Sequence, residues 1–494
     1  FQAEDGIRDL VRSRGLGDVY KRQVKNCYLM GIKGVAMTSL AQILLDDDKQ
    51  VAGCDVAEEF VTQPLLDKLQ IQIDHGFAHS LPQKTDCLIY TSAHSGPKNP
   101  IVLQAKERGI PSYSQAEALA HYFNQKQGIA VCGVGGKTTV SAMITWIMQR
   151  LNLNPSFSVG LGEIIGMNRT GQWQQDSTHF IAEADEYVID PAYKDNHTEM
   201  QPRFSFLQPN LTVCTNLAYD HPDVYNSIQH TQQVFLNFFE QIEDGGALIY
   251  NADSPDLQPI IKTLKKKKGV KFISFGQGET AQARLISSSV EEQRNLGKVQ
   301  YQGENYQLQL AIPGEFNLLN ALAACLAVKQ TDQASFQQTL QAIANFQGTQ
   351  RRFEFKGEKG GVLYYDDYAH HPNEIKKTIQ ALAGWHPKKR KVIAFQPHTF
   401  SRTKQLFNEF VQALGTAQEV LLLDIFPSAR ENFDSTISSN LLVENIRQQF
   451  PNLKISNLGD TEALASYCRE QLKPGDVLLT MGAGDIYKLH NNIS

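Results

Sequence analysis

The strongest chemical signal in the sequence is a glycine-rich run, GVGGKTT at residues 133–139, which directly follows the apolar stretch 129–132. Backbone N–H groups in such a loop, with a helix N-terminus behind them, form a cradle for phosphate oxygens. Lys137 would reach the β- and γ-phosphates of a nucleotide, and the Thr138 hydroxyl would ligate Mg²⁺. Because Val131 stands where the usual phosphate-binding loop has a glycine, we predict a phosphate site in a shortened loop.

Carboxylates and a histidine follow two further apolar stretches. Glu183-Ala184-Asp185-Glu186 closes the predicted strand 178–184, and Asn216, Asp220 and His221 close the predicted strand 211–217. The carboxyl ends of parallel strands share one edge of a sheet, where α/β proteins bind ligands. Carboxylates at such an edge suit a hard cation, so we expect Glu183 and His221 to take part in a metal site.

A weaker glycine pattern, Gly31-Ile32-Lys33-Gly34, follows the predicted strand 26–30. Asp55 comes about 24 residues later, after a second predicted strand at 50–54, where an acidic residue often binds a ribose or a base edge. The pattern is compatible with a tight turn and with a second nucleotide-like ligand.

The last third of the chain places polar side chains after several predicted strands. The runs are QRRFE at 350–354, DDYAHHP at 366–372, FQPHTFSRT at 395–403, DIFPSARE at 424–431 and MGAGD at 481–485. His370 and His371 are adjacent, so on extended backbone they point to opposite sides and cannot chelate one metal together. Arg402 suits a carboxylate or a phosphate. Together these strand ends predict a binding face.

Apolar strands alternate with amphipathic helices along the whole chain, which predicts an α/β fold with parallel sheets covered by helices on both faces. The length of 494 residues suggests about three domains. We place their boundaries at 24–124, 125–347 and 348–494, with a polar linker at 124–128. Residues 1–23 mix acidic and basic side chains without helical or strand periodicity, and we expect a non-native extension there.

The composition narrows the class of protein. Hydrophobic residues make up 41% of the chain and the net charge is −5, so no global basic field favours nucleic acid or an anionic membrane. No apolar run is long enough for a membrane-spanning helix. The 7 cysteines are scattered and never spaced as CxxC, which favours reduced thiols in a cytoplasmic protein.

With these residues assembled, the chain resembles the Mur ligases, the ATP-dependent amino-acid-adding enzymes of peptidoglycan precursor synthesis. The resemblance runs from about Val24 to the C-terminus. It is carried, in order, by GKTT, EADE, N-x-x-x-D-H, P-G-x-x-N (Pro313, Gly314, Asn317), RRFE, DDYAHHP, FQPHTFSRT, SARE and MGAGD.

The resemblance implies a Rossmann-like N-terminal domain that binds UDP, a central P-loop ATPase-like domain, and a Rossmann-like C-terminal domain that closes over both. It implies a UDP-sugar site at Gly31, Gly34 and Asp55, and catalytic roles for Lys137, His370 and Arg402, with His370 and Arg402 positioning the amino acid. It assigns Mg²⁺ to Thr138, Glu183 and His221. It assigns ATP to Gly133, Gly135, Gly136, Lys137, Thr138, Thr139, Asn317, Arg352 and Asp367.

FQPHTFSRT together with DDYAHHP indicates the member that joins L-alanine to the lactyl carboxylate of UDP-N-acetylmuramate through an acyl phosphate. ATP and Mg²⁺ are then the cofactors, and a monomer or weak homodimer is the expected assembly, with neither nucleic acid nor membrane insertion.

The chain also departs from the family's pattern. Val134-Gly135 stands where the family usually has Thr-His, Phe316 replaces a common histidine, and Tyr187 is followed by an insertion-like stretch at 188–209. That stretch is similar to one in the ligase that recycles a whole tripeptide onto the same nucleotide. A tripeptide ligase and a non-catalytic nucleotide-binding protein therefore remain as alternatives.

Overall fold

The computed structural model describes residues 24–493 except 194–198, 222, 267–268 and 428–432. The expected extension 1–23 and the SARE run at 428–431 lie outside these described residues. The chain forms two compact units. The first contains residues up to Ile286 with Lys298–Leu308 and Leu319–Ala344, and the second contains Ser287–Gly297, Gln309–Leu318 and Asn345–Ser494.

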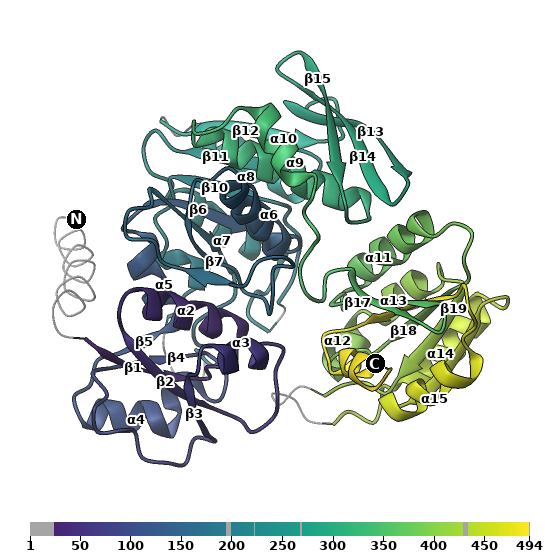
Figure 1. Ribbon diagram of the computed structural model, residues 1–494, viewed down its shortest axis with the longest axis horizontal. Coiled ribbons are helices and arrows are strands. Elements are labelled where there is room, and N and C mark those ends of the chain that lie inside the picture. The colour runs from purple at the N-terminus through teal and green to yellow at the C-terminus, as the bar shows by residue number, and fades with distance from the viewer. Residues whose placement is uncertain (1–23, 194–198, 222, 267–268, 428–432, 494) are drawn as a thin grey trace. The chain divides into compact units, whose positions relative to one another are not determined.

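The first unit begins with a five-stranded parallel sheet of order β3-β2-β1-β4-β5 (Figure 1). Its strands are β1 (Asn26–Met30), β2 (Gln50–Asp55), β3 (Gln72–His75), β4 (Cys87–Tyr90) and β5 (Ser112–Ser114). Its helices are α2 (Val35–Asp46), α3 (Gln63–Lys68), η1 (Gly96–Lys98), α4 (Pro100–Glu107) and α5 (Gln115–Phe123). Alternate residues of β1 face opposite sides, so Leu29 packs with α2 and α5 while Tyr28 packs with α4. Helices therefore cover both faces, as the strand–helix alternation predicted.

A second sheet, most of which belongs to this unit, has ten strands in the order β15-β14-β13-β12-β11-β10-β6-β9-β7-β8. The strands are β6 (Gln127–Cys132), β7 (Ser156–Ser158), β8 (Gly171–Gln172), β9 (His179–Glu183), β10 (Leu211–Cys214), β11 (Ala247–Asn251), β12 (Lys271–Gly276), β13 (Ala283–Glu291), β14 (Arg294–Tyr301) and β15 (Glu304–Leu310). The strands from β12 to β7 are parallel, and β8 is antiparallel to β7.

Helical segments follow most of these strands. They are α6 (Lys137–Arg150), η2 (Arg203–Phe206), α7 (Ile228–Phe239), η3 (Pro255–Leu257), α8 (Gln258–Leu264), α9 (Glu315–Gln330) and α10 (Phe336–Ile343). The aromatic side chains of α7 join the core beneath the sheet, and Trp146 of α6 donates from Nε1 to the carbonyl of Ala342, 3.0 Å away.

Helix α2 connects the two sheets of the first unit. Its buried Ser39 hydroxyl lies 2.8 Å from that of Ser158, and Gln42 donates from Nε2 to the hydroxyl of Thr170 at 2.8 Å. At the end of the same helix, Asp46 forms an ion pair with Arg169 at 2.6 Å. Buried polar groups pair in this way because an unpaired group would lose its hydration without compensation.

The second unit is built around a six-stranded sheet of order β16-β17-β21-β18-β19-β20. Its strands are β16 (Glu354–Lys359), β17 (Val362–Asp367), β18 (Lys391–Phe395), β19 (Glu419–Leu423), β20 (Lys454–Gly459) and β21 (Val477–Met481). All pairs are parallel except β16 with β17. The helices are α11 (Pro372–Trp385), α12 (Phe400–Gln405), α13 (Phe407–Leu414), α14 (Ser439–Gln449), α15 (Thr461–Gln471), η4 (Ile486–Lys488) and α16 (Leu489–Ile493). Helices α11, α13 and α14 share one apolar core with the sheet, and α15 and η4 share another.

The α/β class that the sequence predicted is confirmed, with two local corrections. The polar stretch 124–128 is not all linker, because β6 already begins at Gln127. The predicted strand 211–217 ends at Cys214, and the residues after it form the loop that carries the polar side chains.

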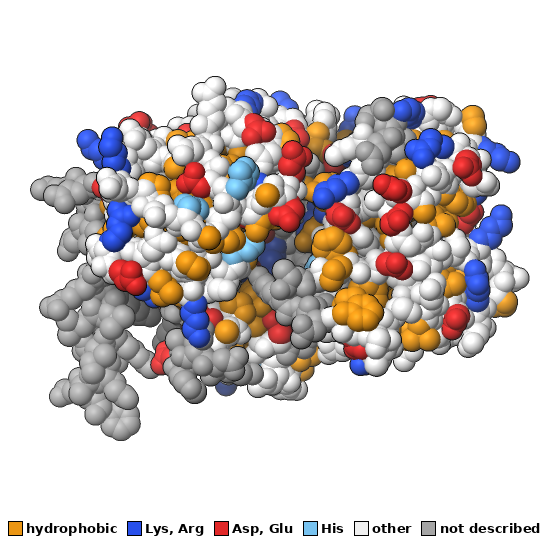
Figure 2. All heavy atoms as spheres, turned by 90° about the horizontal axis from the view of Figure 1, so that it is seen from below, with side chains coloured by type: hydrophobic (Ala, Val, Ile, Leu, Met, Phe, Trp, Pro, Cys, Tyr) orange, Lys and Arg blue, Asp and Glu red, His pale blue; other side chains and the backbone are white. Residues whose placement is uncertain are grey.

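The structure also describes three features that the composition addressed, namely membrane-spanning helices, disulfides and the distribution of charge. Among the described residues, the helices lack the combination of length and apolarity that crossing a bilayer requires. All seven cysteines lie in the described part of the chain, and none forms a disulfide. Acidic and basic side chains are interspersed on the face drawn in Figure 2, as expected for a net charge of −5.

Candidate active site

The phosphate loop between β6 and α6 needs its glycines. Gly133 and Gly136 have φ angles of 123° and 87°, which an L side chain rarely adopts. A Cβ on Gly136 would lie 2.9 Å from Oδ1 of Asn320 on α9. The N–H of Gly135 donates to Asn216 Oδ1 at 3.0 Å, so the loop is fastened to the segment that follows β10.

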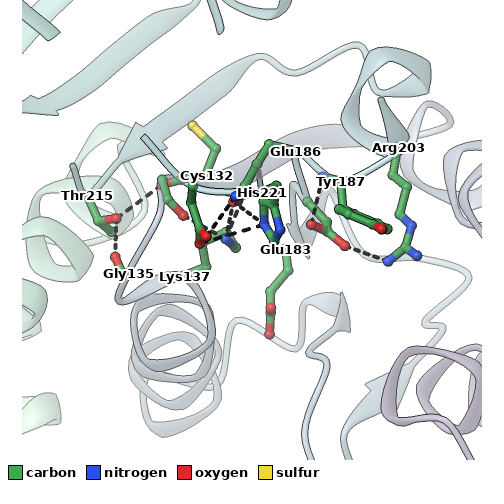
Figure 3. A network of polar contacts seen from close by, with 12 residues as sticks. Cys132, Gly135, Lys137, Glu183, Glu186, Tyr187, Arg203, Thr215 and His221 are labelled. Atoms are coloured by element: carbon green, nitrogen blue, oxygen red, sulfur yellow. Dashed lines mark hydrogen bonds and ion pairs between the residues drawn. The ribbon is translucent and has the colours of Figure 1, made fainter. Parts of the chain in front are cut away.

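Lys137 begins α6 and is held by a buried carboxylate. Its Nζ lies 2.9 and 3.0 Å from the two carboxylate oxygens of Glu186 and 2.7 Å from the carbonyl oxygen of Gly133 (Figure 3). Burial opposes the charged ammonium, but the carboxylates of Glu186 and Asp185 outweigh it and raise the pKa of Lys137. The lysine is therefore a permanent cation at the loop.

Thr138 and Glu183 meet beside this lysine. The Thr138 hydroxyl donates to Oε2 of Glu183 at 3.2 Å, and the N–H of Gly160 donates to Oε1 at 2.8 Å. A hydroxyl and a carboxylate next to a phosphate loop are oxygen donors of the kind that Mg²⁺ prefers, so this pair fits the ion.

His221 lies close to Glu186, a residue of the acidic run with which the sequence predicted it to share a sheet edge. Its backbone has a φ of 57°, and Nε2 is 3.6 Å from Glu186 Oε1 and 3.8 Å from Asp220 Oδ2. Burial alone would lower the pKa of His221, but these two carboxylates raise it. Within the described residues no three His, Cys, Asp or Glu side chains form a preassembled metal cluster.

The sequence analysis gave no separate role to two residues of this site. Glu186 was noticed only as part of an acidic run, although it is the direct partner of Lys137. Arg203 lies in the stretch 188–209, where no motif pointed to it, yet it forms an ion pair with Asp185 at 2.6 Å. Although burial of Asp185 works in the opposite direction, the charges of Arg203 and Lys137 lower its pKa to about 2.

The predicted UDP site shows a tightly bonded turn. Gly31 has a φ of 85°, and Gly34 is the N-cap of α2. Asp55 is almost fully buried and accepts the N–H of Lys33 at 2.7 Å and that of Val56 at 2.8 Å. The carboxylate therefore shapes the turn itself, a use that the spacing of Gly31, Gly34 and Asp55 did not reveal.

Lys33 is a further residue that the sequence analysis did not single out. It is buried, and Nζ donates to the carbonyls of Val56 at 2.9 Å and Glu58 at 2.8 Å, while its own carbonyl accepts from the Thr62 hydroxyl. The lysine thus fixes the chain that follows Asp55.

Three of the predicted strand ends lie side by side at one edge of the sheet in the second unit. Asp367, Met481 and Phe395 end the neighbouring strands β17, β21 and β18 in register. Asp367 accepts the N–H of Phe353 and that of Ala369, both at 2.7 Å. Burial raises the pKa of Asp367 to about 6, although the charge of Arg352 works in the opposite direction.

His370 and Arg402 both lie close to His398 at this edge. The rings of His370 and His398 have centroids 6.4 Å apart, and Arg402 Nη1 lies 3.4 Å from His398 Nδ1. His370 Nδ1 is 3.0 Å from the carbonyl oxygen of Tyr368. His371 has a different task, because its Nδ1 accepts from the N–H of Asn373 at the start of α11.

The two adjacent arginines of the RRFE run have different environments. Arg351 is buried and donates from Nε to Asp366 at 3.0 Å, so it braces the strand end. Arg352, the predicted nucleotide contact, lies over the Tyr368 ring at 5.3 Å. Asn317 is buried in the first turn of α9, where its side chain donates to the carbonyl of Pro313 at 2.7 Å.

Comparison with known sequences identifies the class. The description "Mur ligase family, catalytic domain" matches residues 26–127, "Mur ligase middle domain" matches 131–328, and "Mur ligase, glutamate ligase domain" matches 351–484. The chain belongs to the Mur ligase family.

Individual relatives extend this result. The chain is 36% identical to a UDP-N-acetylmuramate–L-alanine ligase of Clostridium kluyveri, covering 94% of this chain and 97% of the relative. It is 33% identical to the enzyme of the same name from Syntrophotalea carbinolica over 94% and 97% of the two chains.

Solved structures share the fold. The UDP-N-acetylmuramate–alanine ligase of Thermotoga maritima matches with a TM-score of 0.77 at 23% identity, over 95% of this chain and 98% of that one. A murein peptide ligase of Psychrobacter arcticus matches with a TM-score of 0.67 at 20% identity, over the same shares.

Proposed function

We propose that this chain is an ATP-dependent ligase that joins L-alanine to the lactyl carboxylate of UDP-N-acetylmuramate in peptidoglycan precursor synthesis. The observation that carries the proposal is the paired site of Lys137 and Glu186 beside Thr138 and Glu183. It occurs in a chain 36% identical to a ligase of that name over nearly the full length.

The first half of the reaction uses the phosphate loop. A lactyl carboxylate is a poor electrophile, and transfer of the γ-phosphoryl group of ATP to one of its oxygens gives a reactive acyl phosphate, with ADP as the leaving group. Lys137 would hold the β- and γ-phosphates, with the loop from Gly133 to Thr139 around them, and would neutralise the charge that develops during in-line transfer. Thr138 and Glu183 would hold Mg²⁺, with His221 nearby, and the ion supplies further charge neutralisation at the phosphates.

The second half uses the strand ends of the second unit. The Tyr368 carbonyl can only accept a hydrogen bond, so His370 carries its proton on Nδ1 and has a lone pair on Nε2. Burial lowers the pKa of His370, which keeps the ring neutral at pH 7. His370 would take the proton that the alanine ammonium must lose, and Arg402 would bind the alanine carboxylate. The amine then attacks the acyl carbon, and inorganic phosphate leaves.

The remaining assignments are parts of the same proposal. The ranges 24–124, 125–347 and 348–494 would bind the UDP-sugar, ATP and the amino acid respectively, and Gly31, Gly34 and Asp55 would form the UDP site. Asn317, Arg352 and Asp367 would contact ATP. We further propose a cytoplasmic enzyme, a monomer or weak homodimer, that engages neither nucleic acid nor membrane.

The test is phosphate release from ATP and Mg²⁺ with UDP-N-acetylmuramate, adding L-alanine or the tripeptide L-alanyl-γ-D-glutamyl-meso-diaminopimelate in separate reactions. We expect release with L-alanine and none in the Lys137→Ala variant. Release with the tripeptide alone would instead assign the chain to recycling, and release with neither would leave a nucleotide-binding protein.

A further inference from the structure

Backbone hydrogen bonds join the two ends of the stretch 188–209, to which no motif gave a role. Ile189 donates from its N–H to the carbonyl of Gln201 at 3.0 Å, and Arg203 donates likewise to Tyr187 at 2.8 Å. The next residue, Phe204, is buried, and its ring stacks on that of Phe238 with a centroid distance of 4.3 Å. These contacts fix the backbone position of Arg203.

The side chain of Arg203 links two sites. Nη1 donates to Asp185 Oδ2 at 2.6 Å, and Nη2 donates to the hydroxyl of Ser92 at 3.1 Å. Ser92 follows Thr91, whose side chain lies against Gly31 in the predicted UDP turn. The guanidinium carbon also lies 5.5 Å from the centre of the Tyr187 ring. Figure 3 shows the two side chains next to each other. Arg203 therefore stands between the turn at Gly31 and the acidic run beside Lys137.

The carboxylates around this position would repel an anionic substrate unless a nearby cation offset their charge. Glu183, Asp185 and Glu186 place three carboxylates where an anionic sugar nucleotide must approach the phosphate loop. Lys137 is bonded to Glu186 and faces the ATP phosphates in the proposed mechanism. Arg203 remains as the second cation at the acidic run, and about a quarter of its side chain is exposed.

We propose that Arg203 binds an oxyanion of the sugar nucleotide and so positions this substrate between the two sites. The inference rests on the proposed function and extends it to a residue outside the motifs. A guanidinium presents several N–H donors in a planar fork that matches phosphate and carboxylate oxygens. Asp185 and Ser92 would orient the fork, and the oxyanion is supplied by either the diphosphate or the lactyl carboxylate.

The experiment measures ligand binding by calorimetry without turnover. The ligands are UDP, UDP-N-acetylglucosamine and UDP-N-acetylmuramate, with ADP and Mg²⁺ as a separate ligand. The variants are Arg203→Met, Arg203→Lys and Ser92→Ala. Arg169→Met is the matched control, because Arg169 also pairs with an aspartate across the two sheets, but at Asp46, the far end of α2 from Gly31.

We expect Arg203→Met to weaken UDP-N-acetylmuramate binding by at least about 10-fold. ADP binding stays within about 2-fold of the wild type, and Arg169→Met leaves both unchanged. Arg203→Lys, which keeps the charge and loses the fork, and Ser92→Ala, which loses one bond to the guanidinium, give smaller losses. Equal losses for all three uridine nucleotides identify the diphosphate as the ligand, and a loss restricted to UDP-N-acetylmuramate identifies the carboxylate.

Wild-type affinity for UDP-N-acetylmuramate in Arg203→Met, or in Arg203→Lys and Ser92→Ala if the first variant fails to fold, would overturn the inference. An equal loss in Arg169→Met would also overturn it, because the effect would then belong to contact between the sheets. If the wild type binds none of the uridine nucleotides, the proposed function itself fails and the inference falls with it.

Discussion

At the scale of single residues, the main feature is the bidentate contact between Lys137 and Glu186. The Glu186 carboxylate is almost fully buried, and it accepts hydrogen bonds from the ammonium group of Lys137. The nucleotide phosphates would bind this same ammonium group. A buried charge without its partner is costly, so each of the two residues depends on the other in the absence of ligand. A phosphate oxygen would serve as a replacement partner for Lys137.

This dependence predicts the behaviour of Glu186→Gln. The variant leaves Lys137 without its buried countercharge, and we expect it to melt several degrees below the wild type. Adding ADP and Mg²⁺ supplies a new countercharge, so the nucleotide should raise the melting temperature more in the variant than in the wild type. Differential scanning fluorimetry measures both shifts, with Glu199→Gln as an exposed control; equal nucleotide shifts would contradict the account.

Asp367 gives a prediction about pH. Its pKa is raised by burial from 3.8 to about 6, so folding favours the protonated acid. The stabilisation is fully present below pH 3.8 and is lost as the pH rises through 6, a change of about 3 kcal/mol. Relative to Asp367→Asn, which cannot titrate there, the wild type should lose about 2 kcal/mol of this unfolding free energy between pH 4 and pH 6, and the remainder at lower and higher pH. Urea unfolding across this range tests it, and parallel pH curves for the two proteins would refute it.

At the scale of elements, the turn that opens α2 shows why two similar glycines are not equivalent. Gly31 has a φ of 85°, and a Cβ there would collide with the Thr91 side chain. Gly34 has a φ of −62°, and a Cβ there would meet only a carbonyl oxygen, 3.4 Å away. The pattern G-x-x-G treats the two positions alike, but the backbone does not.

We therefore expect different results from alanine at the two positions. Gly31→Ala should lower the free energy of unfolding by more than about 1 kcal/mol, because a side chain is strained at positive φ and meets Thr91. It should also weaken UDP binding. Gly34→Ala, the matched control for stability, should unfold like the wild type. Thermal unfolding and UDP titration measure the two effects of Gly31→Ala, and similar losses of stability in the two variants would count against this description of the turn.

Some of the strands were predictable from the sequence, and others were not. Buried strands such as β1, β6 and β18 were predictable, because continuous apolar runs are typical of parallel sheets. The hairpins of β13, β14 and β15 were missed, since their strands are mostly polar. Their two-residue turns contain Glu292-Gln293 and Gln302-Gly303, all at positive φ, and only the last pair has the glycine that marks such a turn.

At the scale of the whole molecule, the alternation of strands and helices predicted the α/β class, and the order of the motifs predicted the family. The sequence did not predict that the first two sheets belong to one compact unit. That result depends on pairs such as Gln42 with Thr170 and Arg203 with Ser92, which are more than 100 residues apart and follow no pattern. A motif marked Lys137 and Thr138 in the sequence, whereas the ion pairs of Glu186 with Lys137 and of Arg203 with Asp185 are revealed only by tertiary contact.

In the proposed reaction a phosphoryl group passes to the substrate carboxylate before the amide forms. This step can be followed with UDP-N-acetylmuramate that carries ¹⁸O at both oxygens of the lactyl carboxylate, together with ATP, Mg²⁺ and L-alanine. One carboxylate oxygen leaves with the phosphate in the proposed reaction, so mass spectrometry should find one ¹⁸O atom in each inorganic phosphate formed with the product. Phosphate without ¹⁸O would show hydrolysis of ATP by water and would contradict the account.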